Sequence, residues 1–286
     1  MASNWDDLAE LKETQEIKEQ SNNLLLIDGI NVAFRYLHRK NFDSFTDDYI
    51  RTVSSLAKSY QAKRVICCFD AGASLYRKTL FPDYKANRKV ERTEEEQERF
   101  TAFFECLNQT VEELPFEHYK FKGIEADDVI AYFSLHLSKQ YEHTWIVSSD
   151  RDLYQLLSDR VSIFNLFSRN EVTLESLYEK FEMTPREYAF SRIIEGDKSD
   201  NILGIEGIGP KRSAALVKEY KTLDNLLNSL PLKGRSKYIT NLNNGIKTLE
   251  QNEKLINLID YNEDVISCVE KQELVNSMLE KALKQT

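Results

Sequence analysis

The sequence is poor in cysteine, proline and glycine, and each scarcity excludes a class of protein. Four cysteines in 286 residues, with Cys67 and Cys68 adjacent, match neither a zinc-binding spacing nor a disulfide framework. Nine glycines and five prolines exclude collagen-like, mucin-like and long low-complexity segments. No apolar run approaches the roughly 18 residues that a membrane span needs, and the N-terminus carries acids where a signal peptide would carry bases. We therefore expect a reduced, soluble, cytoplasmic protein that does not bind membranes.

The net charge of −9 is unevenly distributed along the chain. Residues 1–20 and residues 250–286 each have a net charge of −4, so the rest of the chain is nearly neutral. The segment Arg77–Arg92 has six basic residues against two acidic ones. Because local patches decide whether a polyanion can dock, the acidic total does not exclude nucleic acid as a partner.

Short apolar runs alternate with segments of helical periodicity in the first two thirds of the chain. This alternation predicts an α/β fold with a mostly parallel central sheet flanked by helices. The apolar runs predict strands over Leu24–Asp28, Arg64–Asp70, Glu117–Phe121, Thr144–Ser149 and Val161–Leu166. Helical spacing predicts helices over Thr46–Tyr60, Thr93–Gln109 (which begins with a capping box) and Glu125–Lys139.

The length suggests one large domain or two ordinary ones, and 41% hydrophobic residues suffice for a core. We expect residues 1–20 to be a charged tail and residues 21–190 to be the α/β core. The pattern is helical from about Thr173 onward, so residues 191–286 are expected to form a helical region.

Nine acidic residues stand at the ends of predicted strands and helices. Ligands of parallel sheets bind beyond the carboxyl ends of the strands, where Asp28, Asp70 and Asp150 are expected. Carboxylates gathered there repel one another unless cations neutralise them, and oxygen ligands suit Mg²⁺ or Mn²⁺. Two such ions would stabilise the attacking and leaving oxygens in phosphodiester cleavage. The candidate metal ligands are Asp28, Asp70, Glu125, Asp127, Asp128, Asp150, Asp152, Asp197 and Asp200.

Sequence spacing also predicts which of these acids share a face. Glu125 and Asp128 lie three residues apart at a helix start, and Asp197 and Asp200 share a face if their segment is helical. The alternative for any single acid is a helix cap or a solvated loop. The four histidines show neither metal-binding nor catalytic-triad spacing.

Two further segments suggest contacts with nucleic acid. Phe81–Lys89 sets Tyr84 beside Lys85 and Arg88, which offers base stacking next to phosphate-binding charge; a solvated basic loop is the alternative. Gly204–Ala215 contains Gly204, Gly207 and Gly209 followed by Pro210, Lys211 and Arg212. Glycines permit a tight turn, and the amides of the following helix start can bind phosphate. We interpret residues 200–220 as a helix-hairpin-helix that contacts the DNA backbone.

In their order, these motifs resemble those of bacteriophage-encoded flap endonucleases, which are 5′-nucleases of the PIN-like superfamily. The resemblance runs from about Leu24 to Leu258. It rests on Ile27-Asp28-Gly29-Ile30-Asn31, Phe69-Asp70, Tyr84-Lys85-Ala86-Asn87-Arg88, Glu125-Ala126-Asp127-Asp128, Ser149-Asp150-Arg151-Asp152, Gly196-Asp197-Lys198-Ser199-Asp200-Asn201 and the glycine hairpin.

The resemblance implies a monomeric, structure-specific 5′-nuclease of DNA replication that uses two Mg²⁺ or Mn²⁺ ions. Its substrates would be branched or 5′-flap DNA and RNA primers on DNA, and its products 5′-phosphate and 3′-hydroxyl ends. One metal would be held by Asp28, Asp70, Glu125 and Asp127 with Asp128 close by, and the other by Asp150, Asp152 and Asp200 with Asp197 nearby.

The family also implies roles for the basic residues. Lys85 would contact the scissile phosphate, Tyr84 would stack on a base, and Arg88 would stabilise developing charge. Residues 84–114 would form a helical arch that admits a single-stranded 5′ end, and the hairpin would bind K⁺ against duplex DNA. The expected DNA contacts are Arg35, Lys89, Arg92, Gly204, Gly207, Gly209, Lys211 and Arg212.

One segment departs from this pattern. Glu105–Leu114, in the second half of the expected arch, has three glutamates and neither lysine nor arginine. Two rival functions stay open: a non-catalytic protein that binds branched DNA, and a phosphohydrolase with Asp28 as nucleophile. The first would be expected to lack metal ligands, and the second usually has an acid where Ile30 stands.

Overall fold

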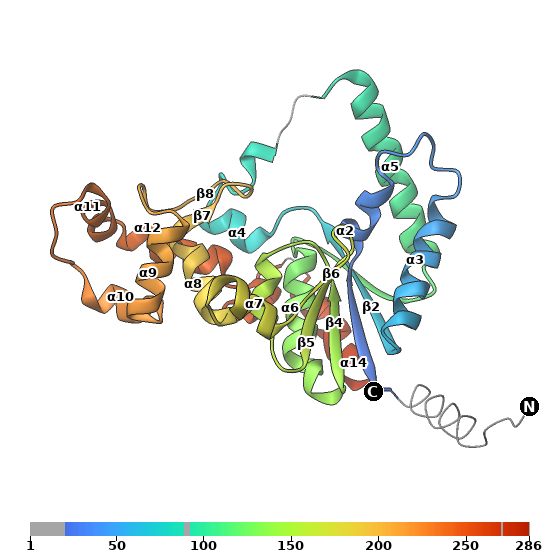
Figure 1. Ribbon diagram of the computed structural model, residues 1–286. Helices are drawn as coiled ribbons and strands as arrows, with labels where there is room; N and C mark the ends of the chain where they lie inside the picture. Colours follow the sequence, from blue (N-terminus) through green and yellow to red (C-terminus); the bar gives the residue numbers. More distant parts are fainter. Residues whose placement is uncertain (1–20, 89–91, 270, 286) are drawn as a thin grey trace, which may run out of the picture.

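The computed structural model describes residues 21–88, 92–269 and 271–285. Their core is a six-stranded sheet with the strand order β3-β2-β1-β4-β5-β6 (Figure 1). Strands β1 to β5 are parallel and β6 is antiparallel to β5. The bounds are β1 Asn23–Asp28, β2 Ala62–Ala71, β3 Glu117–Lys122, β4 His143–Val147, β5 Val161–Asn165 and β6 Asn170–Val172.

Helices cover both faces of this sheet, which is why its central strands are apolar throughout. Leu24 and Leu26 of β1 point into one core layer, beneath α6 (Ala126–Leu137). Leu25 and Ile27 point into the other, beneath α3 (Phe45–Ser59) and α5 (Glu94–Glu113). The adjacent cysteines follow the same alternation, so Cys68 belongs to the first layer and Cys67 to the second.

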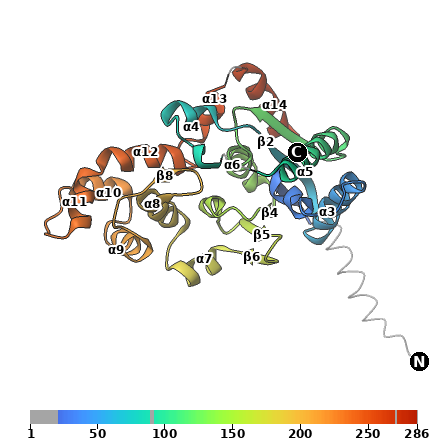
Figure 2. The ribbon, with the colours of Figure 1, turned by 90° about the horizontal axis from the view of Figure 1, so that it is seen from above.

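The rest of the described chain is mainly helical and forms a second lobe beside the sheet (Figures 1 and 2). A two-stranded antiparallel sheet, β7 (Gly196–Asp197) with β8 (Ile202–Leu203), lies within it. The remaining helices are α2 Gly29–Ala33, α4 Leu75–Leu80, α7 Leu174–Phe181, α8 Pro185–Glu195, α9 Pro210–Tyr220, α10 Leu223–Ser229, α11 Lys237–Asn244, α12 Ile246–Ile256, α13 Asn262–Ser267 and α14 Gln272–Lys284. None of the described helices is both long and apolar enough to cross a membrane.

The five predicted strands and three predicted helices are all present with small shifts of their ends. The capping box of Thr93 and Glu96 starts α5 as expected, but this helix continues to Glu113 because its first breaker is Pro115. The predicted boundary near residue 190 falls inside α8, and the predicted tail, residues 1–20, lies outside the described residues.

The segment predicted as an arch has two different halves. The first half of α5 is solvent-exposed and rises above the sheet (Figure 1). In the second half, Phe103, Leu107 and Val111 are buried against α3 and the sheet. The lack of lysine and arginine in Glu105–Leu114 is explained by this packing, because this half of α5 is part of the hydrophobic core.

Candidate functional site

Three acids meet at the carboxyl ends of the parallel strands, as the sequence predicted. Asp28, at the end of β1, caps α2 by accepting a hydrogen bond from the Asn31 amide at 3.0 Å. Its other oxygen accepts from Ser148 Oγ at 2.8 Å, and Ser148 Oγ in turn accepts from the Asp150 amide at 3.0 Å. Asp70 accepts from the Ala126 amide at 2.6 Å, which joins the end of β2 to the start of α6.

These carboxylates repel one another in a buried cleft. Burial, and then the charge of Asp70, raise the pKa of Asp28 to about 7. Burial and the charges of Asp150 and Asp28 raise the pKa of Asp127 well above its usual range. Burial and the charge of Asp150 raise the pKa of Asp152 to about 7. A cation bound among them would relieve the repulsion and restore the ionised forms.

Basic side chains reach several of the acids from the rim of the cleft. Lys85 Nζ lies 2.6 Å from Glu125 Oε1 and 3.6 Å from Asp200 Oδ2. Arg192 Nη2 lies 2.6 Å from Asp197 Oδ2, and its Nε is 3.3 Å from Asp152 Oδ1. Arg88 pairs with Asp200. Among the described residues, no three acid, histidine or cysteine side chains form a preassembled metal centre. The donor set is nevertheless entirely oxygen, as hard divalent cations require.

Asp128 and Asp197 are held by arginines. The two oxygens of Asp128, which is fully buried, each accept a hydrogen bond of 2.7 Å from Arg77. Asp128 and Glu125 do share a face, since Arg77 also lies 3.4 Å from Glu125 Oε2. Burial alone would raise the pKa of Asp197, but hydrogen bonds from Ser199 and the charge of Arg192 hold this pKa below its usual range. Because both oxygens of Asp128 are bound by Arg77, we leave Asp128 out of the ligand set proposed below.

The segment around Asp197 and Asp200 is a turn between β7 and β8. It is not a helix, which was the condition for these two acids to share a face. The turn still brings them together, because Ser199 Oγ lies 2.7 Å from Asp197 Oδ1 and 3.4 Å from Asp200 Oδ1.

Tyr84 does not have the position that base stacking requires. Its side chain is only 2% exposed, and its hydroxyl lies 2.8 Å from Glu125 Oε2 and 3.0 Å from Asp200 Oδ2. The next residue, Lys85, has a left-handed backbone with φ at 57°, and its amide donates to the Asp200 carbonyl at 2.9 Å. The expectation of a stacking Tyr84 is therefore wrong for this structure.

The other expected DNA contacts that the structure describes lie on separate elements. Arg35 is exposed in the short turn after α2, and Arg92 lies over the Phe100 ring at 4.0 Å. Lys89 lies outside the described residues. Lys211 and Arg212 are exposed in the first turn of α9, and Arg212 stacks on the Tyr238 ring at 4.4 Å.

The glycine hairpin differs in extent from its prediction. Residues 200–220 contain a single helix, α9, because β8 and a turn precede it; the helix packed beside α9 is α8 (Figure 1). Gly204 is required by close approach, since a Cβ there would lie 2.0 Å from the Glu195 carbonyl oxygen. Gly207 adopts a positive φ of 85°, which favours glycine.

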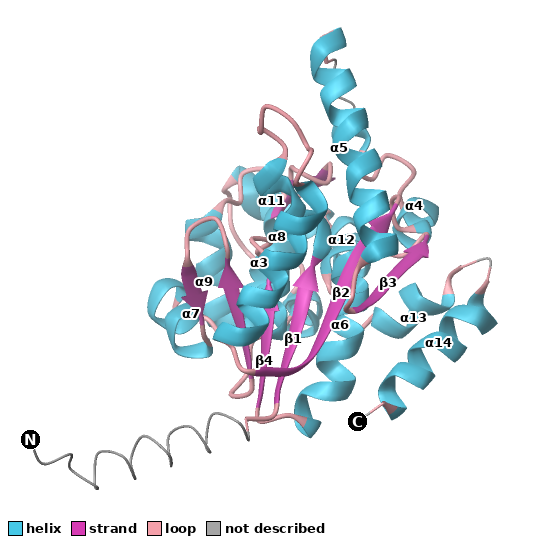
Figure 3. Ribbon diagram, turned by 90° about the vertical axis from the view of Figure 1, so that its right-hand side faces the viewer, coloured by secondary structure: helices cyan, strands magenta, loops and turns pink. Residues whose placement is uncertain are grey.

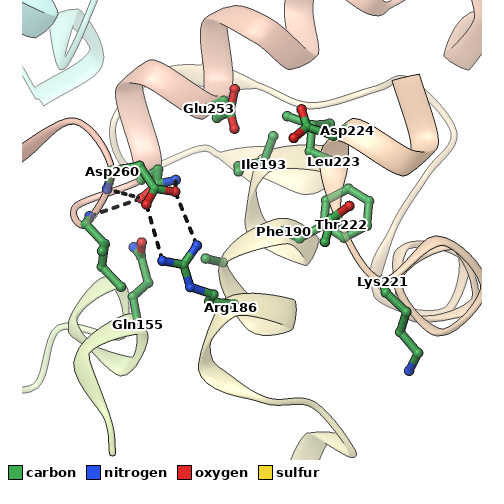
Figure 4. Close-up of a pocket in the computed structure, with 13 residues that line it drawn as sticks. Gln155, Arg186, Phe190, Ile193, Lys221, Thr222, Leu223, Asp224, Glu253 and Asp260 are labelled. Atoms are coloured by element: carbon green, nitrogen blue, oxygen red, sulfur yellow. Dashed lines mark hydrogen bonds and ion pairs between the residues drawn. The ribbon is translucent and has the colours of Figure 1, made fainter. Parts of the chain in front are cut away.

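A second pocket, between α8 and α12, shares no lining residue with the carboxylate cleft (Figure 4). Among its charged residues Arg186 pairs with Asp260, since Arg186 Nη2 lies 3.3 Å from Asp260 Oδ1, and Asn257 also donates a hydrogen bond to Asp260 at 2.8 Å. Sequence reasoning missed three residues that organise the cleft, Arg77, Arg192 and Ser148. Spacing gave no signal for Arg77 and Ser148, because their acidic partners Asp128 and Asp28 are distant in sequence. Arg192 stands only five residues before Asp197, but its second partner, Asp152, is 40 residues away.

Comparison with known proteins supports the nuclease interpretation. Residues 23–182 match the family described as 5′-3′ exonuclease, N-terminal resolvase-like domain, and residues 183–275 match 5′-3′ exonuclease, C-terminal SAM fold. The chain belongs to the 5′-3′ exonuclease family. The predicted family, fold class and enzyme class are confirmed: this is a structure-specific 5′-nuclease.

The relatives support this assignment over most of the chain. The flap endonuclease of Escherichia phage T5 is 37% identical over 267 residues, which cover 91% of each chain. A 5′-3′ exonuclease of Bacillus subtilis is 33% identical over 254 residues, or 82% of each. A crystal structure of the T5 D15 flap endonuclease in complex with DNA and metal ions matches with a TM-score of 0.88 and 35% identity, covering 92% of this chain and 100% of that one.

Proposed function

We propose that this nuclease cleaves branched DNA near 5′ flaps and 5′ ends, and removes RNA primers, with two Mg²⁺ or Mn²⁺ ions. The observation that carries the proposal is the convergence of Asp28, Asp70, Asp127 and Asp150 on one cleft, where burial and the charges of neighbouring acids raise their pKa values. Such a cluster needs cations to be fully charged at neutral pH. The DNA and metal ions in the related phage T5 structure support the same assignment.

The proposed ligands form two groups around the cleft. Asp28, Asp70, Glu125 and Asp127 would hold one ion, and Asp150, Asp152 and Asp200, with Asp197 beside them, would hold the other. Bound divalent ions supply charge that polarises a phosphodiester and lowers the pKa of water. Ser148 and Arg192 would position the ligands, since they hydrogen-bond to Asp28 and Asp152 respectively.

Lys85 is the residue proposed to act on the substrate. Its ammonium group pairs with Glu125 and Asp200, which face the cleft, so a phosphate there would come within its reach. Arg88, whose side chain is 54% exposed, would add a second positive charge at the same rim. Tyr84 would instead orient Glu125 and Asp200 through its hydroxyl.

The substrate would be bound by surfaces on both sides of the cleft. Arg35, Lys89 and Arg92 would contact the 5′ strand near the exposed half of α5. Gly204, Gly207, Gly209, Lys211 and Arg212 would contact the backbone of the duplex, with K⁺ at the hairpin. We propose that the protein acts as a monomer.

The decisive experiment is cleavage of a 5′-labelled flap duplex with Mg²⁺, with Mn²⁺ and with EDTA. We expect products from the flap junction with either metal and none with EDTA. A matched nicked duplex and an RNA-flapped duplex would establish the preference for structure and for primers. Cleavage in EDTA, or equal cleavage of unbranched single strands, would contradict the proposal.

A further inference from the structure

A groove of about 570 Å³ lies at the edge of the central sheet, between the end of β3 and α14. Figure 3 shows α14 beside β3 on this side of the molecule. Among the described residues the groove and the carboxylate cleft have no lining residue in common, so the groove stands apart from the proposed nuclease chemistry. The volume is within the range of about 300–1,000 Å³ typical of ligand pockets.

Large apolar side chains line the groove and are unusually exposed. Leu274 is 55% exposed, Leu75 is 40% exposed and Met278 is 39% exposed, and Val269 lies beside them. Contiguous exposed apolar surface rimmed by polar groups is typical of a protein-binding site. Leu75 lies on α4, whereas Leu274 and Met278 lie on successive turns of α14. The patch therefore combines segments that are distant in sequence.

Four lysines surround this apolar floor: Lys78, Lys120, Lys122 and Lys271. No aspartate or glutamate stands among the described lining residues, although the chain has a net charge of −9. Within the described residues none of the four lysines forms an ion pair; Lys120 donates to Asn108 at 2.7 Å and Lys78 to the Pro82 carbonyl at 3.0 Å. The groove is therefore complementary to a negatively charged ligand with apolar groups.

Two observations favour a peptide over single-stranded DNA. Grooves that bind single strands stack bases on exposed aromatic rings, but the aromatic lining residue here, Phe121, is only 7% exposed and belongs to the core. In addition, β3 is an edge strand of the sheet, and among the described strands its one partner is β2. The outer edge of such a strand offers backbone groups to an extended peptide.

We propose that this groove docks an acidic peptide segment of a partner protein, with the apolar side chains of the peptide on Leu75, Leu274 and Met278. Its carboxylates face Lys122 and Lys271. Binding there leaves the carboxylate cleft open, so the nuclease can be recruited by a partner while it acts on DNA.

The test is fluorescence anisotropy with a labelled peptide in which aspartates alternate with leucine and phenylalanine. We expect saturable binding in the micromolar range that weakens with salt. Leu274→Glu, at an exposed position, and Lys122→Glu should each weaken binding by about tenfold or more. Lys139→Glu, a reversal at an exposed lysine outside the groove, is the matched control and should bind like the wild type. Peptides with asparagine for aspartate, or serine for the apolar residues, should bind poorly.

Several results would overturn the proposal. One is peptide binding that both groove variants retain, and another is displacement of the peptide by a single-stranded oligonucleotide. If a synthetic peptide of residues 1–20 of this chain binds more tightly, the occupant is the chain itself. If the protein forms a dimer that Leu274→Glu dissociates, the occupant is a second copy. Circular dichroism of each variant would show that the fold is retained.

Discussion

Arg77 and Asp128 form a bidentate ion pair in the protein interior, with both nitrogen–oxygen distances at 2.7 Å. The same guanidinium donates to the Leu255 carbonyl at 2.8 Å and lies 3.4 Å from Glu125. One buried cation thus connects α4, the start of α6 and the end of α12. Through its contact with Glu125, Arg77 ties this proposed metal ligand to the buried pair with Asp128.

Removing one partner of this pair should be costly. Arg77→Met leaves Asp128 charged and unpaired in a fully buried position, which typically costs about 3–5 kcal/mol. We expect urea unfolding to show a loss of this order. The double variant Arg77→Met/Asp128→Leu should recover much of it, because no charge is then left without a partner. A single variant as stable as the wild type would contradict this view of the pair.

Neutralising one carboxylate of the cleft should abolish catalysis but not DNA binding. Asp150→Asn removes a proposed metal ligand and also relieves repulsion with its acidic neighbours, including Asp200 and Asp197. We expect no detectable cleavage, wild-type affinity for a flap substrate in EDTA, and equal or higher thermal stability without metal. Wild-type-like turnover in this variant, or in Asp70→Asn, would refute the two-metal assignment.

The stability of the metal-free protein should depend on pH with a defined sign. The pKa values of Asp28 and Asp152 are raised from 3.8 to about 7. Between pH 3.8 and about pH 7, these two carboxyl groups therefore bind more protons in the folded chain than in the unfolded chain. The free energy of unfolding should therefore fall as pH rises from about 4 to 7, on the order of several kcal/mol, since each unit of pKa shift is worth about 1.4 kcal/mol. Urea titrations in EDTA across this range measure the effect. Adding Mg²⁺ at pH 8 should restore the lost stability, and a flat pH profile would contradict the prediction.

Lys85 should contribute to the rate rather than to affinity. A preorganised charge near the reacting phosphate is worth roughly 10²–10³ in rate, by analogy with oxyanion-hole deletions. We expect Lys85→Ala to lose rate on this order in single-turnover cleavage with saturating enzyme, with little change in flap affinity. Lys89→Ala should mainly weaken binding. If Lys85→Ala cleaves at the wild-type rate once the enzyme is saturating, Lys85 contributes only to substrate binding.

The glycine hairpin should bind duplex DNA without regard to sequence. Lys211→Ala with Arg212→Ala removes two exposed charges from the first turn of α9. Affinity for a duplex should fall equally for unrelated sequences, and the salt dependence should flatten by about one to two phosphate contacts. If the salt dependence of duplex affinity is unchanged in this variant, the duplex binds at another surface.

The sequence allowed the sheet and the carboxylate cleft to be predicted, because both depend on local patterns. Apolar runs that end at Asp28 and Asp70 are strands with acids at their carboxyl ends, and parallel pairing brings those ends together. The position of Tyr84 could not be predicted, since it depends on hydrogen bonds of its hydroxyl to Glu125 and Asp200, far away in sequence. Arg77 was missed for the same reason, because its partner Asp128 lies 51 residues away, and so was the contact of Arg192 with Asp152, 40 residues away.

The alternation of Cys67 and Cys68 between the two core layers has a practical consequence for chemical labelling. Both thiols are fully buried, and burial raises their pKa, so neither presents a thiolate to a maleimide. Cys106 on α5 and Cys268 after α13 are partly exposed. Thiol dyes should thus react first at Cys268, next to Val269 of the lysine-lined groove. They should react more slowly at Cys106 on α5, because burial also raises the pKa of this thiol. No engineered cysteine is needed.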